Sequence, residues 1–182
     1  MENKKQPGMS KHVIIIGCLL AAILLLVIVL LAIPYLAGKK RFTSKEHGYS
    51  LVVDTRNADY KSVLLDTVTK VRMDRFDIKR SNGAYYMSVA PIAEGSDLEE
   101  DIALVMKSET YSYEFRREDN VTYGEGRYPA VKISYTDSDG GETREVDYYY
   151  DKENRLIITV CTNEANRAEL ESMLASIRIL EK

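Results

Sequence analysis

The hydrophobic pattern divides the chain into an apolar N-terminal run and a longer region of mixed character. Residues 13–33 read VIIIGCLLAAILLLVIVLLAI, 21 residues without a charged or strongly polar side chain. As an α-helix rising about 1.5 Å per residue, this run matches a hydrocarbon core of about 30 Å. We therefore predict a short tail over 1–12, a transmembrane helix over 13–37, a juxtamembrane linker over 38–48 and one domain over 49–182.

The first part of the domain alternates short apolar runs with turn residues. A strand is predicted over 49–54, YSLVVD. Residues 59–70 place apolar side chains at helical spacing, but their Val and Thr content keeps a strand open as the alternative. Two further strands over 71–79 and 84–91 flank Ser81-Asn82-Gly83. Asn-Gly between apolar runs predicts a hairpin, because both residues tolerate positive φ.

The second part of the domain predicts a helix, a run of strands and a final helix. Ser96 and Glu99 have the spacing of a capping box. The apolar stripe of the helix that follows consists of Leu98, Ile102, Val105 and Met106. Alternating apolar and polar positions predict strands over 121–123, 130–136, 143–150 and 156–161. A helix from about Glu164 then carries an apolar stripe that is expected to pack on the sheet.

This order of elements indicates the fold class. Strands followed by a packing helix, without regular βα alternation, are typical of an α+β architecture. The prediction is an N-terminal transmembrane helix followed by one domain with a mainly antiparallel sheet packed by helices.

Four short segments carry a family resemblance: HGYSL at 47–51, GRYPAV at 126–131, YYY at 148–150 and LASIR at 174–178. With the order of elements, they resemble the PsbP-type fold, found in an extrinsic photosystem subunit and in small bacterial membrane-tethered or lipoprotein domains similar to it. The resemblance implies a binding or assembly module without an active site, and it supplies no functional residue.

The apolar run also contains IIGC at 15–18, which is close to the lipidation signal of bacterial lipoproteins. A signal peptide needs about 7–15 apolar residues before its cleavage site, whereas here only 13–17 precede Cys18. An uncleaved anchor is therefore favoured over a lipoprotein or a cleaved signal peptide.

Charges beside the apolar run bear on its orientation. Lysines 4, 5 and 11 lie before it, and Lys39, Lys40, Arg41 and Lys45 lie after it. The positive-inside rule therefore supports the two possible orientations of the helix almost equally. A short tail followed at once by an anchor is the usual build of an exported domain. We therefore expect a single-pass protein of the cell membrane, with a cytoplasmic tail and an extracytoplasmic domain.

The charge balance of the domain argues against nucleic acid as a partner. The first 41 residues hold six Lys or Arg and one acidic residue, so of 25 basic and 28 acidic residues the remainder carries 19 and 27, a net charge of −8. Such a domain repels nucleic acid.

Residues for catalysis or metal binding are scarce, and no HExxH, CxxC, Walker-type or GxSxG motif occurs. The two histidines are His12 and His47, and we expect His47 to be a solvated linker residue. Cys161 is interpreted as a small buried hydrophobe rather than a reactive thiol. We expect no enzyme activity, no cofactor and no metal site.

One acidic pattern invites a calcium interpretation. Asp137, Asp139 and Glu142 echo part of an oxygen-rich loop. The match to an EF-hand loop is incomplete, and two strands joined by Asp and Gly need only turn geometry, so the hairpin is favoured.

Tyrosine is the unusual feature of the composition, with 13 Tyr, 3 Phe and no Trp. Tyrosine is enriched at binding surfaces, but it also suits a half-buried strand. The candidate partner or ligand surface is formed by Tyr135, Tyr148, Tyr149 and Tyr150. Consecutive strand residues point to opposite faces, so 148–150 cannot form one continuous platform.

These observations lead to two hypotheses for function. The first is a non-catalytic extracytoplasmic domain, held to the bilayer by 13–37, that binds a protein partner in an envelope or secretion assembly. The alternative is a ligand-binding sensor or receptor domain for a small molecule, sugar or cation. A deep concavity lined by tyrosines would favour the second hypothesis, and a flat exposed patch would favour the first.

The anchor makes a prediction about the mature chain. Intact-mass analysis of the protein extracted from membranes should give a chain that retains the apolar run and carries no lipid on Cys18. A mature protein that begins at Cys18 would contradict the uncleaved anchor.

Overall fold

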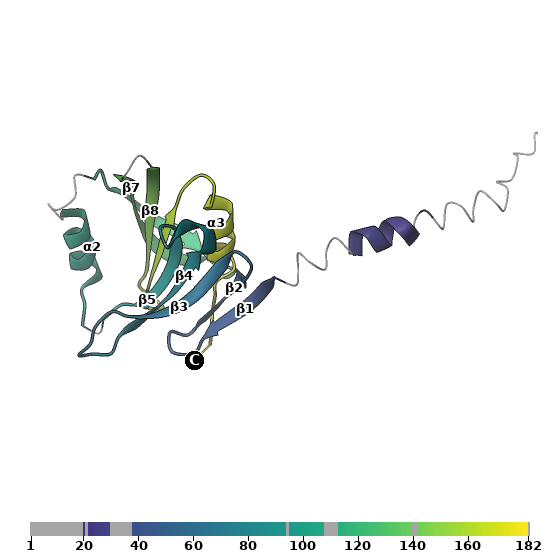
Figure 1. The fold of residues 1–182 in the computed structure, drawn as a ribbon. Coiled ribbons are helices and arrows are strands. Elements are labelled where there is room, and N and C mark those ends of the chain that lie inside the picture. The colour runs from purple at the N-terminus through teal and green to yellow at the C-terminus, as the bar shows by residue number, and fades with distance from the viewer. Residues whose placement is uncertain are drawn as a thin grey trace, which may run out of the picture. The chain divides into compact units, whose positions relative to one another are not determined.

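The computed structural model describes residues 20, 22–29, 38–93, 95–107, 113–139 and 142–181, and it divides into two units, Met1–Lys39 and Lys40–Lys182 (Figure 1). In the first unit, residues 20 and 22–29 are helical, and the large apolar side chains among them are 44% to 65% exposed. The predicted membrane span over 13–37 otherwise lies outside the described residues. Within the described part of the chain, no helix is both long and apolar enough to cross a bilayer.

The domain has an α+β fold built on two antiparallel sheets. The small sheet has the order β1-β2-β10, and the large sheet has the order β3-β4-β5-β9-β8-β7-β6. The strands of the small sheet are β1 (Lys39–Ser44), β2 (Tyr49–Asp54) and β10 (Arg178–Ile179). Those of the large sheet are β3 (Ala58–Leu64), β4 (Arg72–Ile78), β5 (Tyr86–Pro91), β6 (Arg116–Tyr123), β7 (Tyr128–Asp139), β8 (Glu142–Asp151) and β9 (Leu156–Thr162). The helices are α2 (Leu98–Lys107), α3 (Arg167–Ala175) and the single-turn η1 (Lys79–Ser81).

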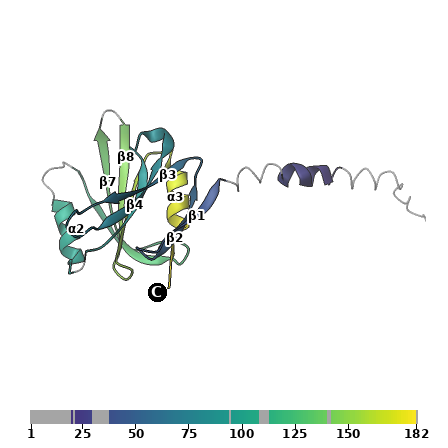
Figure 2. The same cartoon turned by 60° about the horizontal axis from the view of Figure 1, so that its bottom comes forward.

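The main core lies between one face of the large sheet and the layer formed by α3 and the small sheet (Figure 2). Its fully buried side chains include Tyr49, Leu51, Phe76, Met87, Ile158 and Leu170. A second cluster joins α2 to the opposite face of the large sheet through Ile102, Ile133 and Tyr150. The two helices therefore cover opposite faces of one sheet.

Several predicted elements are confirmed. The strand over 49–54, the strands flanking the Asn-Gly hairpin and the four strands of the second half are all present, as are the two helices. Asn82 and Gly83 have φ values of 50° and 80°, which is why Asn-Gly suits this turn.

Residues 59–70 were predicted as a helix with a strand as the alternative, and the helix is wrong. Each residue of β3 pairs with a residue of β4, from Ala58↔Ile78 to Leu64↔Arg72. This ladder satisfies the backbone groups that a helix would have paired internally. Leu64 is 40% exposed and Val68 is 85% exposed, so their helical spacing does not mark a buried face.

The folded part also begins earlier than the predicted boundary at residue 49. Part of the predicted linker over 38–48 forms β1, which lies beside β2 in the small sheet. Phe42 packs edge-on against Phe76 of the core, with ring centroids 5.1 Å apart. A single aromatic residue among polar neighbours gives no strand signal in the sequence. The pairing of β1 with β2 and the packing of Phe42 together hold the strand in place.

The cap of α2 differs from the predicted capping box. Asp97, rather than Ser96, accepts the first free N–H groups, with its Oδ1 2.9 Å from the amide nitrogen of Glu99. The Ser96 hydroxyl instead donates to Asp101. Asp and Ser are both good capping residues, so the sequence alone could not separate two adjacent candidates.

Removal of a core side chain of α3 should test this packing. Leu170 is fully buried, so Leu170→Ala is expected to lower the free energy of unfolding by about 2–5 kcal/mol through lost burial and a cavity. The side chain of Glu171 is 62% exposed, and Glu171→Ala should change it by less than about 0.5 kcal/mol. Denaturant titration of the full chain in detergent measures both values, and equal effects would contradict the placement of α3.

Candidate functional site

The strand register separates the predicted tyrosines onto two faces of the large sheet. Tyr148 and Tyr149 pair with neighbouring residues of β7, so their side chains point in opposite directions. Tyr135 and Tyr150 share the face of Tyr148. Tyr149 lies on the other face, where it packs against the main core. Three of the four predicted residues are thus brought together, and the fourth is not.

The same register adds tyrosines that the sequence pattern did not single out. Tyr86 of β5 pairs with Cys161, which pairs with Val146, which pairs with Tyr135. Directly paired residues lie on one face, so Tyr86 belongs with Tyr135. Tyr113, which precedes β6, stacks on Tyr135. We call this surface the tyrosine face, and it consists of Tyr86, Tyr113, Tyr135, Tyr148 and Tyr150.

Ring contacts join four of these residues into a ladder. The ring centroids of Tyr113 and Tyr135 are 4.7 Å apart with planes inclined by 19°. The Tyr135 and Tyr148 centroids are 6.2 Å apart, and those of Tyr148 and Tyr150 are 6.3 Å apart. These spacings fall in the range of favourable aromatic pairs. The ladder therefore forms a continuous aromatic strip across β7 and β8.

Helix α2 covers one end of the tyrosine face and leaves the rest partly open. Tyr150 lies beside Ile102 of α2 and is only 3% exposed. The other four tyrosines are half-buried. Burial, followed by repulsion from Tyr148 when both are ionised, raises the pKa of Tyr150 to about 12. Burial and the same neighbour also raise the pKa of Tyr135.

An arginine completes the other side of the face. The Arg75 guanidinium carbon lies 3.7 Å from the centroid of the Tyr86 ring, which is a close cation–π contact. Arg75 is held there because its Nε donates to Asp77 Oδ1 at 2.7 Å and its Nη2 donates to the Gly83 carbonyl at 2.8 Å. Lys61 also donates to Asp77. The carboxylate of Asp77 is therefore neutralised by two cations.

The acidic hairpin considered for calcium uses Asp137 in another way. Arg144 Nη2 lies 2.6 Å from Asp137 Oδ2, and the Tyr113 hydroxyl donates to Oδ1 at 2.9 Å. The β7–β8 hairpin pairs Asp139 with Glu142. Asp137 thus holds Tyr113 against the sheet, and no metal-binding group of three ligands occurs among the described residues.

Cys161 is buried, as predicted. Its side chain donates to the Ala84 carbonyl, with Sγ 3.3 Å from the oxygen. Burial raises the pKa of its thiol, which makes it less reactive at neutral pH.

The expectation of a solvated His47 is wrong. Its side chain is 3% exposed, and its Nε2 lies 3.9 Å from Asp74 Oδ2. Asp74 is itself buried and accepts hydrogen bonds from the hydroxyls of Tyr49, at 2.9 Å, and Tyr60, at 2.8 Å. The turn between β1 and β2 places the His47 side chain against the domain, and no local sequence signal predicts this burial.

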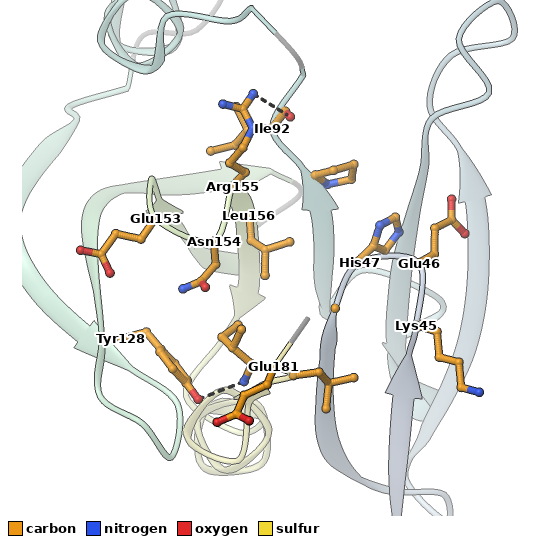
Figure 3. Close-up of a pocket in the computed structure, with 14 residues that line it drawn as sticks. Lys45, Glu46, His47, Ile92, Tyr128, Glu153, Asn154, Arg155, Leu156 and Glu181 are labelled. Atoms are coloured by element: carbon orange, nitrogen blue, oxygen red, sulfur yellow. Dashed lines mark hydrogen bonds between the residues drawn. The ribbon is translucent and has the colours of Figure 1, made fainter.

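A separate cavity is lined by none of the residues of the tyrosine face. Its volume is about 1010 Å³, and Figure 3 shows Glu46 and His47 on one side of it and Tyr128, Glu153 and Asn154 on the other. Arg155 is tied to the backbone, since its Nη2 donates to the carbonyls of Ile92 and Ala93. Among the tyrosines that the structure describes, only Tyr128 lines this cavity, and its hydroxyl accepts the N–H of Ile179 at 3.0 Å.

Comparisons of the chain with protein-family models, curated proteins and solved structures gave no match. The resemblance to the PsbP-type fold therefore stays a prediction.

The raised pKa of Tyr150 predicts how the domain responds to alkali. Because its pKa rises from 10.0 in the unfolded chain to about 12 in the fold, the stabilisation it provides is complete below pH 10 and is lost as the pH rises toward 12. The full loss is about 3 kcal/mol at most. Tyr150→Phe cannot ionise, so its free energy of unfolding should fall less over this pH interval than that of the natural chain. Identical pH profiles from denaturant titration would contradict the burial of the hydroxyl.

Proposed function

We propose that the chain is a single-pass membrane protein whose non-catalytic domain binds a protein partner through the tyrosine face. The partner would belong to an envelope or secretion assembly on the outer side of the cell membrane. The observation that carries the proposal is the partly open ladder of Tyr113, Tyr135 and Tyr148, with Arg75 stacked on Tyr86 beside it.

The residue types of this surface support a protein partner. Tyrosine and arginine are enriched in the cores of protein interfaces, where a few buried aromatic or arginine side chains provide most of the binding energy. Asp77 and Asp137 are already paired with Arg75, Lys61 and Arg144. A partner would therefore not need to neutralise an isolated charge when it covers the face.

The membrane anchor is supported by the helical residues 22–29. These residues are all apolar, and the large side chains among them are more than two-fifths exposed. Leaving so much apolar surface in water is unfavourable, whereas the hydrocarbon of a bilayer removes that cost. Together with the apolar run over 13–33, this favours a bilayer as the surroundings of the segment.

The way in which the titratable groups near the tyrosine face are used supports a non-catalytic role. The carboxylates of Asp77 and Asp137 accept hydrogen bonds from fixed cations and hydroxyls, and Cys161 is buried beneath the tyrosine face. Such groups hold a surface in shape, and none is poised as a nucleophile or general base.

A ligand-binding sensor domain is the second candidate function, and the cavity of about 1010 Å³ favours it. Its lining combines an apolar floor at Leu156 with charged groups at Lys45 and Glu46. A saturable rise in Tm with a soluble ligand, unaffected by changes in the tyrosine face, would favour this function over the first.

Truncation of the ladder should weaken partner binding. A photo-crosslinking amino acid in place of Tyr135 should capture a reproducible partner in intact membranes. Tyr148→Ala should then reduce capture of that partner about thirtyfold or more, because loss of an aromatic anchor typically costs about 2 kcal/mol or more. Tyr149→Phe, on the opposite face, is the matched control and should leave capture unchanged. Equal losses for both variants, or capture of no reproducible partner, would contradict the proposal.

A further inference from the structure

The turn between β3 and β4 presents apolar side chains to solvent. Leu64 is 40% exposed, Leu65 is 51% exposed and Val68 is 85% exposed. Figure 1 shows this turn projecting from the domain at the end away from the start of β1. Leu64 ends β3, and Leu65 and Val68 lie in the turn that follows it. Isolated exposed aliphatic residues are ordinary, but three within five residues at one end of a hairpin call for an explanation.

The turn is ordered by its own hydrogen bonds. The amide of Leu65 donates to the Val71 carbonyl at 2.8 Å, and the amide of Val68 donates to Asp66 Oδ1 at 2.7 Å. The Thr69 hydroxyl donates to Asp66 Oδ2 at 2.6 Å. The carboxylate of Asp66 is therefore directed into the turn, and several backbone donors already have partners. These bonds reduce the number of backbone donors that would lose water at the headgroup region of a membrane.

Basic residues follow the apolar side chains. Lys70 and Arg72 are exposed, and no ion pair of either side chain occurs within the described residues. Arg72 lies along β3, where its Nε donates to the Ser62 hydroxyl at 2.7 Å. Apolar side chains bordered by Lys and Arg match the interface of a membrane, where hydrocarbon lies beneath phosphate headgroups.

We propose that the β3–β4 turn is a lipid-contacting site that places Leu65 and Val68 in the headgroup region of the membrane that holds the anchor. This inference rests on the membrane anchor proposed above. It is independent of the partner that the tyrosine face binds.

The size of the patch favours lipid over protein. A stable protein interface buries about 1,200–2,000 Å² in total, far more than three aliphatic side chains at a turn can provide. A tethered domain needs only a weak lipid contact, because tethering gives the turn a high effective concentration at the bilayer. A second attachment would also restrict how the domain rotates on its tether, and so would fix the direction in which the tyrosine face points.

The absence of tryptophan from the chain allows a direct test. The full chain carrying Leu65→Trp is reconstituted into vesicles of phosphatidylcholine and phosphatidylglycerol, with and without brominated acyl chains. Tryptophan in contact with lipid should emit at shorter wavelength, should be quenched several-fold by the brominated lipid and should be protected from aqueous iodide. The matched control is Glu171→Trp on the exposed side of α3, which should behave as a solvated residue.

A second variant and a fractionation step separate the outcomes. Adding Val68→Asp to the Leu65→Trp chain should remove most of the bromine quenching without altering the fold. Quenching of Leu65→Trp no greater than that of Glu171→Trp would overturn the proposal, as would shielding that develops only when a protein extract is added. Carbonate extraction of the same vesicles tests the anchor separately. A chain that is washed off the vesicles would disprove the anchor. A chain that stays in the vesicles while its β3–β4 turn is solvated would disprove only the lipid contact.

Discussion

The register of the large sheet is the constraint on which the other features depend. Side chains alternate between faces with a period of two, so one register decides whether Tyr148 or Tyr149 joins the aromatic ladder. The core holds this register in place. Ile158 is fully buried on the core face of β9 and pairs with Tyr149. A one-residue shift would move Ile158 out of the core and bring Thr159 to the core face, which is costly enough to exclude the alternative pairing.

Buried carboxylates explain part of the high tyrosine content. Asp74 accepts hydrogen bonds from the hydroxyls of Tyr49 and Tyr60, and Asp151 accepts one from the hydroxyl of Tyr123. Each of these hydrogen bonds satisfies a buried carboxylate that water cannot reach. Burial also raises the pKa of Tyr49 and of Tyr123, which favours the neutral phenol that donates the bond. Tyrosine therefore has two uses in this domain. One set donates hydrogen bonds to buried carboxylates in the core, and the other set forms the tyrosine face.

This division shows what the sequence could and could not predict. Local alternation was enough for the strand over 49–54 and for the hairpin at Asn82-Gly83, because those signals act between near neighbours. The strand β3 is set by its pairing with β4, which outweighs the helical spacing of its own residues. The burial of His47 beside Asp74 and the place of Tyr86 beside Tyr135 depend on partners far along the chain. Composition indicated that tyrosine mattered, but only the long-range register separates the tyrosines of the core from those of the surface.

The arrangement of the two helices determines what a partner can meet. Helix α3 closes the core face of the large sheet, and α2 covers only the Tyr150 end of the tyrosine face, so the open part of the ladder lies around Tyr135 and Tyr148. The charges beside it are paired, with Arg75 bound to Asp77 and Arg144 to Asp137. Binding there would depend on aromatic shape and cation–π contact rather than on long-range attraction. Short-range contacts of that kind would gain most from the proposed membrane anchor, because an anchor would keep the domain close to a partner in the same membrane. The proposed roles of the apolar run and of the tyrosine face would then depend on each other.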